Sequence, residues 1–268
     1  VHMCGAAADM DAILDVCKRH DLTLLEDAGQ ALVAFYRGKS VGLFGAAGAY
    51  SFDFFKIVTA GEGGLCVTND EGLYDRIQQF SDHGHDHIGD NRGMEQHPIL
   101  GTNFRISELH AAVGLAQMRK IDDIRNAKRE NKAYLKSKLS GINGLTFRPM
   151  PDEEGDSGTF LNFFLPTQEK AQALAQRLPE KGVGVNYWYT NMYHFINQWD
   201  HLKSLKSPFK MAIHHLGAPQ DYANLELPQS QEVIGRLISM GIKVTWTKEE
   251  MDAMLEIMIP EIKSVLGE

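Results

Sequence analysis

The feature of this sequence that most restricts its fold is an alternation of helical and extended patterns in the first half of the chain. From Met10 to Lys18 apolar residues recur at helical spacing, and the short apolar run Leu22 to Leu25 follows, ending abruptly in two acids. Gly45 to Phe54 and Gly63 to Thr68 then indicate two strands, and Asp70 caps a further helix. Such βα alternation predicts a mainly parallel sheet covered by helices.

A much longer helical pattern begins at Ser107, its predicted cap, and charged residues dominate it from Arg125 to Lys138. Glycines at 141 and 144 end this pattern. The remainder alternates strand-like pieces, LTFRPM, FLNFFLP and VGVNYWYT, with helical ones. The sequence therefore predicts an α/β protein with a large domain over residues 1–140, connecting helix included, and a smaller C-terminal α/β domain over residues 141–268.

Composition and charge exclude several classes of protein. Of the 268 residues, 43% are hydrophobic and 23% charged, the formal net charge is −8, and no Lys/Arg block is longer than a pair. This pattern favours neither nucleic acid nor an anionic membrane as a partner. Apolar runs stop short of membrane-spanning length, and Cys4, Cys17 and Cys66 have the unrelated spacings of reduced thiols. We expect a cytoplasmic protein that binds small polar molecules.

Chemically useful side chains cluster where two strands are expected to end. Asp27 follows the first predicted strand within the segment EDAGQA, and Lys56 follows the second within SFDFFK, before the small-residue turn TAGEGG. In open α/β sheets the ligand crevice lies beyond the carboxyl ends of the strands. Asp27 and Lys56 are therefore candidates for one site, although taken singly Asp27 also fits a helix cap and Lys56 a surface lysine.

Together these segments resemble the DegT-type sugar aminotransferases, fold type I enzymes that use pyridoxal 5′-phosphate (PLP). The resemblance covers nearly the whole chain, through Val1 to Gly5, the pair His83-Gly84 and the segment GTNFRISE that begins at Gly101. Within the family, SFDFFKIVTAGEGG, FSDHGHDHIG and YWYTNMYHF look like the 8-amino-3,8-dideoxy-manno-octulosonate transaminases. Those enzymes aminate C8 of an oxidised Kdo sugar for lipopolysaccharide, so the resemblance implies amino transfer from an amino acid, glutamate, to 8-oxo-Kdo.

The resemblance implies a role at the cofactor for five residues. Lys56 would bind PLP as a Schiff base and, once displaced, carry a proton between the substrate carbon and the cofactor. Asp27 would pair with the pyridinium nitrogen, and Gln30, one helical turn later if a helix follows, would donate to the ring hydroxyl. Ser51 and Asn103 would hold the phosphate, with Asn103 reaching in from the neighbouring subunit of a homodimer with shared active sites. The structural alternatives are a strand serine for Ser51 and a turn residue for Asn103.

Three further residues are candidates for the substrate because they match or border the resembling segments. Arg105 would bind a carboxylate of the amino donor or of the sugar, with a structural ion pair as the alternative. Trp188 and His194 would frame the sugar from the smaller domain, with a place in the core as the alternative. The family's tyrosine-proline-histidine element has no counterpart in residues 190–193, which lack proline.

The run Asp82 to His87 alternates histidine with aspartate and so raises the question of a metal site. We expect no metal there, because Gly84 and the lack of a second ligand cluster with a defined spacing favour a loop beside the active site. In that loop His83 and His85 would bind hydroxyls or the carboxylate of the sugar. A solvated loop without contact to the substrate is the alternative.

Other functions stay open. An aminotransferase for a nucleotide-linked ketosugar fits the same motifs, whereas a non-catalytic, ligand-binding member of the fold has no need of Lys56 together with Asp27 and Gln30. A family dehydratase would carry histidine in place of Lys56. Family members begin well before the segment matched by Val1, with the loop that binds the phosphate. We therefore expect an N-terminally incomplete large domain that binds PLP poorly alone.

Overall fold

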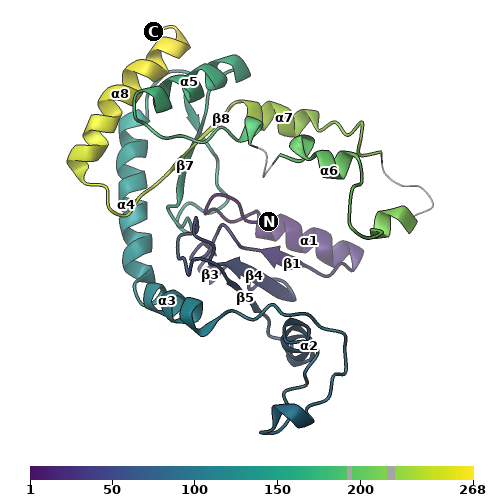
Figure 1. The fold of residues 1–268 in the computed structure, drawn as a ribbon. Helices are drawn as coiled ribbons and strands as arrows, with labels where there is room; N and C mark the ends of the chain where they lie inside the picture. Colours follow the sequence, from purple (N-terminus) through teal and green to yellow (C-terminus); the bar gives the residue numbers. More distant parts are fainter. Residues whose placement is uncertain (192–194, 216–220) are drawn as a thin grey trace. The chain divides into compact units, whose positions relative to one another are not determined.

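The computed structural model describes residues 1–191, 195–215 and 221–268, which form two compact units (Figure 1). Unit 1 comprises residues 1–132 and 149–159, and unit 2 comprises residues 133–148 and 160–268. The chain first passes from unit 1 to unit 2 within helix α4, Ile121–Leu139, and residue 140 follows the end of this helix. Both units combine helices with a sheet, so the predicted α/β class is confirmed.

The central sheet of unit 1 has three described strands in the order β1-β4-β5: Leu25–Asp27, Ala47–Ser51 and Gly64–Val67. β1 and β4 run parallel, whereas β4 and β5 run antiparallel. The described strands therefore form a mixed sheet instead of the mainly parallel one predicted. The cause is the connection from β4 to β5, which contains no crossover helix, and a parallel pair needs such a crossover.

Three helices of unit 1 are each preceded by a cap residue whose side chain accepts a backbone N–H of the first turn. They are α1, Met10–His20; α2, Glu71–Ser81; and α3, Glu108–Met118. The predicted caps Asp70 and Ser107 are both confirmed, because Asp70 accepts from the N–H of residue 73 and Ser107 from that of residue 110.

The single long helix predicted from Ser107 is two helices, because α3 ends at Met118 and α4 begins at Ile121. Asp122 and Asp123 lie in the first turn of α4, where carboxylates interact favourably with the positive end of a helix dipole. A new helix start is therefore stabilised at this point. The helix continues through the predicted charged stretch and ends before Gly141, as expected.

The core of unit 1 lies between α1, the sheet and the segment that follows β1, and it is built from small and aromatic residues such as Ala28, Tyr36 and Tyr50. Strands β2 (Phe35–Tyr36) and β3 (Lys39–Ser40) form an antiparallel hairpin with a two-residue turn. Both turn residues have positive φ, as a type I′ turn requires. Among the described residues no helix is long and apolar enough to cross a bilayer.

Unit 2 has an antiparallel sheet in the order β6-β7-β8: Thr146–Phe147, Phe160–Phe164 and Leu237–Gly241. Its helices are α5, Gln168–Glu180; α6, Asp200–Lys203; α7, Pro228–Gly235; and α8, Lys248–Leu266. α5 packs against α8, and leucines of α5 and α4 fill the core with Phe163 of β7. The predicted strand in VGVNYWYT is wrong, because Asn186 forms a single bridge with Ser239 before the chain enters a 3₁₀ turn.

Candidate functional site

Two parallel strands of unit 1 end at the same edge of the sheet and bring Asp27 and Ser51 together. Asp27 is the last residue of β1 and stands in register with Ala49, two residues before Ser51 ends β4. The N–H of Ala28 donates to the carbonyl of Ala49 at 2.9 Å, so the pairing continues to the strand ends. This edge is where a ligand crevice is expected in an open α/β sheet.

The Asp27 carboxylate is exposed at this edge and has acceptor capacity to spare. One oxygen, Oδ1, accepts the N–H of Gly29 at 3.0 Å, and no hydrogen bond or ion pair to the other oxygen is present in the described part of the chain. A Cβ at position 29 would lie 3.1 Å from Oδ1 and 3.6 Å from the Cβ of Ser51. The absence of a side chain at Gly29 thus keeps the space between Asp27 and Ser51 open.

Gln30 follows in a turn, and the helix that was considered at this point does not form. Its backbone carbonyl accepts the N–H of Gly5 at 2.9 Å, and its side-chain Oε1 accepts the N–H of Cys4 at 3.2 Å. The second bond fixes which end of the amide is the acceptor. The other end, Nε2, is then the end that can donate to a ligand.

Lys56 lies on the loop that leaves the carboxyl end of β4. The Oγ of Ser51 accepts the N–H of Asp53 at 3.2 Å, and the carbonyl of Asp53 accepts the N–H of Lys56 at 3.0 Å. The Lys56 side chain is half-buried, and its Nζ makes no hydrogen bond or ion pair among the described residues. The loop therefore presents a primary amine near the strand ends without committing it to a structural contact.

Glu26, the neighbour of Asp27 in β1, belongs to a buried hydrogen-bonded pair that sequence analysis did not single out. Glu26 and His2 are almost fully buried, and His2 Nε2 is 3.0 Å from Glu26 Oε2. The N–H of Ala8 donates to His2 Nδ1, so in the neutral ring Nε2 carries the proton and donates to Glu26. Burial holds the pKa of His2 below 6.5, which keeps this neutral form. An acid within an apolar strand needs buried partners, and that requirement was the available signal.

Glu26 also accepts three backbone N–H groups from the loop before β4, those of Gly42, Phe44 and Gly45. Burial would raise the pKa of the Glu26 carboxyl, but these donors and His2 outweigh it, and the pKa is lowered from 4.5. A single buried carboxylate thus connects the start of the chain, β1 and the loop that leads into β4. The neighbouring Asp27 is held on that framework.

Asn103 and Arg105 belong to a segment that pairs with the end of α2, where Asn103 forms a bridge with Asp82. Oδ1 of Asn103 accepts both the backbone N–H and the Nε of Arg105, each at 3.2 Å. The structure does not bring Asn103 against Ser51 or Lys56 of the same chain. Arg105 Nε also lies 3.3 Å from Asp82 Oδ1, so an ion pair, one of the two alternatives for this arginine, is present.

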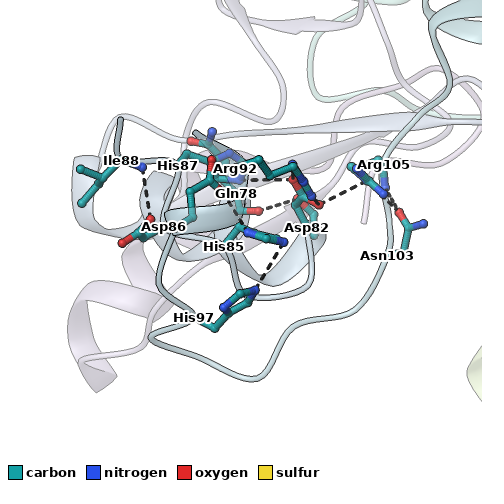
Figure 2. Close-up of polar contacts among 12 residues, drawn as sticks. Gln78, Asp82, His85, Asp86, His87, Ile88, Arg92, His97, Asn103 and Arg105 are labelled. Atoms are coloured by element: carbon teal, nitrogen blue, oxygen red, sulfur yellow. Dashed lines mark hydrogen bonds and ion pairs between the residues drawn. The ribbon is translucent and has the colours of Figure 1, made fainter. Parts of the chain in front are cut away.

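Asp82 is the centre of a cationic cluster (Figure 2). Arg92 binds it with two parallel hydrogen bonds of 2.9 and 2.7 Å, and His87 Nε2 lies 3.5 Å from Oδ2. Hydrogen bonding to Arg92, aided by the charge of Arg105, lowers the pKa of Asp82 to about 2 although burial opposes this. Sequence analysis missed Arg92, because a separation of ten residues across a loop carries no periodic signal.

His83 and His85 are separated by the structure. His83 is exposed, has a positive φ and makes no side-chain contact among the described residues. His85 instead has contacts within the same loop, with Nδ1 2.9 Å from Glu95 Oε2 and Nε2 3.4 Å from His97 Nε2 (Figure 2). Within the described residues no group of three or more His, Cys, Asp and Glu is placed to hold a metal ion.

The two remaining candidates belong to unit 2. Trp188 is half-buried, its indole N–H donates to Ser239 Oγ at 2.6 Å, and its ring meets Phe160 edge-on. These contacts agree with the alternative of a place in the core. His194 lies outside the described residues.

A hollow of about 1000 Å³ lies on unit 1, but it does not contain Asp27 or Lys56. Its lining is mostly apolar, from β5, α2 and the segment 104–106, with Leu65, Phe80 and Phe104 among it. Arg76 and Arg105 also line it, but a mostly apolar hollow has few other groups that could orient a polar substrate. The strand-end group of Asp27, Ser51 and Lys56 is chemically the better candidate.

Several known proteins are similar to this chain. The family model described as the DegT/DnrJ/EryC1/StrS aminotransferase family matches residues 1–259. GDP-perosamine synthase of Caulobacter vibrioides is 38% identical over 149 residues, which are 56% of this chain and 39% of the relative. The chain thus matches about two fifths of that relative's length.

Solved structures share the fold. PseC of Helicobacter pylori, an aminotransferase involved in the biosynthesis of pseudoaminic acid, has a TM-score of 0.79 at 20% identity, over 98% of this chain and 65% of that one. 3-Amino-5-hydroxybenzoic acid synthase has a TM-score of 0.77 at 26% identity, over 98% of this chain and 66% of that one.

Proposed function

This chain belongs to the DegT/DnrJ/EryC1/StrS aminotransferase family, and we propose that it is part of an enzyme that moves an amino group from glutamate to an oxidised sugar. Aminotransferases of this family use PLP. The observation that carries the proposal is the gathering of Asp27, Ser51 and Lys56 at the carboxyl ends of β1 and β4. The proposed acceptor is C8 of 8-oxo-Kdo, which the segments around Lys56 and His83 favour.

The residues present fit PLP. The spare oxygen of Asp27 is placed to accept a hydrogen bond from a protonated ring nitrogen, a charge-assisted bond that contributes roughly 1.5–3 kcal/mol. When bound, the cofactor supplies an electron-withdrawing ring that stabilises charge on the carbon that loses its proton. The glycine at position 29 leaves open the space that the ring needs beside Asp27.

Lys56 is proposed to hold the cofactor covalently through its Nζ and then to act as the acid and base. As a free amine, Nζ would take a proton from the carbon of the amino donor and return one at the neighbouring position. Its lack of other partners among the described residues supports this role, because a lysine held in an ion pair would have to break that pair first.

The other cofactor residues would orient the group. Gln30 would donate from Nε2 to the ring hydroxyl, the end that its bond to the Cys4 N–H leaves as donor. Ser51 would bind the phosphate with its hydroxyl. Asn103, which has no contact with Ser51 in its own chain, would bind the phosphate of a second copy, so we propose a homodimer with shared sites.

Substrate contacts are proposed for two clusters. Arg105 is held by its Nε, and its Nη groups make no contact among the described residues, so they can bind a carboxylate of the donor or of the sugar. His83 and His85 would lie beside the sugar. A sugar acid such as 8-oxo-Kdo offers the carboxylate that such an arginine binds.

The experiment assays the longest natural polypeptide that contains this chain, with glutamate and PLP, on a panel of oxidised sugars. Mass spectrometry of the products should show an added amino group on 8-oxo-Kdo, and Lys56→Ala should abolish it. Amination of a nucleotide-linked ketosugar instead would refute the choice of sugar and keep the reaction. The perosamine synthase relative is named for a nucleotide-linked product of this kind. No amination of any sugar would refute the function.

A further inference from the structure

The loop between α2 and the segment at Asn103 carries a pair of histidines that the proposed reaction does not explain. His85 and His97 are twelve positions apart in sequence, yet the loop folds so that their rings lie 4.2 Å apart between centroids (Figure 2). Their Nε2 atoms face each other at 3.4 Å. A short hydrogen bond between imidazoles would bring these atoms to about 2.7–3.2 Å, so this contact is a weak one.

The same separation is the one expected of two ligands on one metal ion. Two nitrogens bound tetrahedrally to Zn²⁺ at ~2.0–2.1 Å lie about 3.3 Å apart. The Nε2 atoms of His85 and His97 therefore lie at the separation of two ligands of one ion, and the rings, whose centroids are 4.2 Å apart, must turn to direct both lone pairs at it. His97 is exposed, which leaves access from solvent.

Glu95 supplies the second feature of a metal site. Its Oε2 lies 2.9 Å from His85 Nδ1, and both side chains are largely buried. The contact has the distance but not the angles of a hydrogen bond, and a rotation of the His85 ring that completes it would put the proton on Nδ1 and leave the lone pair on Nε2 for a ligand. A carboxylate that orients a metal-bound histidine is a common arrangement around zinc.

Charge in the loop also favours a cation. Residues 82–97 contain four carboxylates and one arginine, which is a formal charge of −3 with neutral histidines. Asp82 is committed to Arg92 and Arg105, whereas Glu95 lies against His85 and also attracts Arg92. The field at the histidine pair is therefore suited to a divalent cation and unfavourable to an added anion.

We propose that His85 and His97 bind one divalent transition-metal ion, Zn²⁺ in the first instance, with Glu95 as the residue that orients His85. The described residues supply two ligands, one fewer than at the usual open zinc site, and the remaining positions take water or an oxygen of a bound molecule. The site is independent of the cofactor. It is compatible with the proposed contact of His85 to the sugar, because a sugar oxygen can fill an open position.

The test is metal binding by the chain itself, freed of metal by a chelator and without PLP. Zn²⁺ is titrated against a chromophoric competitor, and Co²⁺ is added separately to record its visible absorption. Wild type should bind one equivalent more than His97→Ala, and the Co²⁺ band should be lost with it. Glu95→Gln should weaken binding by about 10-fold or more. Since the readout involves no amino transfer, its failure leaves the proposed function intact.

The matched control is His83→Asn, which removes an exposed histidine of the same loop and keeps a residue that tolerates a positive φ. It should bind Zn²⁺ like wild type. Far-UV circular dichroism checks that each variant folds. The proposal is overturned if wild type and His97→Ala bind the same number of equivalents, or if His83→Asn loses as much binding as His97→Ala.

Discussion

Glu26 offers the sharpest test of how the site is held, because one buried carboxylate accepts four donors. Oε2 accepts from Gly42 N–H at 2.7 Å and from His2, and Oε1 accepts from the N–H groups of Phe44 and Gly45. Glu26→Gln keeps the shape but leaves one acceptor oxygen, so two donors lose their partner. At about 1.5–3 kcal/mol per charged hydrogen bond, the free energy of unfolding should fall by about 3–6 kcal/mol.

The pH dependence of this loss has a definite sign. The pKa of Glu26 is lowered by folding, so its contribution is complete above about 4.5 and is lost as pH falls below it. The pKa of His2 is also lowered, so its neutral form begins to cost stability as pH falls below about 6.5. The difference between wild type and Glu26→Gln should therefore be full at pH 7 and shrink below pH 4.5.

The assay is urea unfolding followed by far-UV circular dichroism, because all three tryptophans lie in unit 2 and their fluorescence does not report on unit 1. Hydrogen exchange at the amides of Gly42, Phe44 and Gly45 gives the local readout and should accelerate in the variant. Glu62→Gln, an exposed glutamate of unit 1, is the control and should change stability by less than about 0.5 kcal/mol. A Glu26→Gln protein as stable as this control would refute the reasoning.

Two further predictions concern other parts of unit 1. Arg92→Ala should raise the pKa of Asp82 from about 2 toward 3.8, which a carboxyl titration followed by NMR would detect. The loss of stability expected of wild type between about pH 4 and 2 should then diminish, and an unchanged pKa would contradict the geometry. Gly158→Ala should lower the free energy of unfolding by more than about 1 kcal/mol. The φ of Gly158 is +76°, and a Cβ there would lie 2.6 Å from the backbone nitrogen of Arg129. An unchanged urea midpoint would refute this prediction.

Features with a local signal were predictable from the sequence. Asp70 and Ser107 stand before apolar-periodic segments, and each caps a helix as predicted. Asp27 stands at a strand end, as predicted, because an apolar run that stops at a polar residue marks the edge of a buried strand, whereas β4 ends at Ser51, three residues before the predicted end at Phe54. Their roles at a cofactor remain predictions.

Features that depend on long-range pairing were not predictable. β5 runs antiparallel to β4 because the connection between them contains no helix, and the residue pattern of β5 does not indicate this direction. Trp188 is bound to Ser239, 51 positions later, and neither residue signals the other. The contacts of His85 with His97 and of Asp82 with Arg92 form across a loop whose path has no periodicity.

The central claim, that Lys56 holds the cofactor beside Asp27, is tested most directly by covalent trapping. The longest natural polypeptide containing this chain is incubated with PLP and reduced with borohydride, and its peptides are mapped by mass spectrometry. The account predicts a pyridoxyl adduct on the peptide that contains Lys56 and its absence in Lys56→Ala. An adduct on another lysine of the wild-type protein, with Lys56 unmodified, would contradict it.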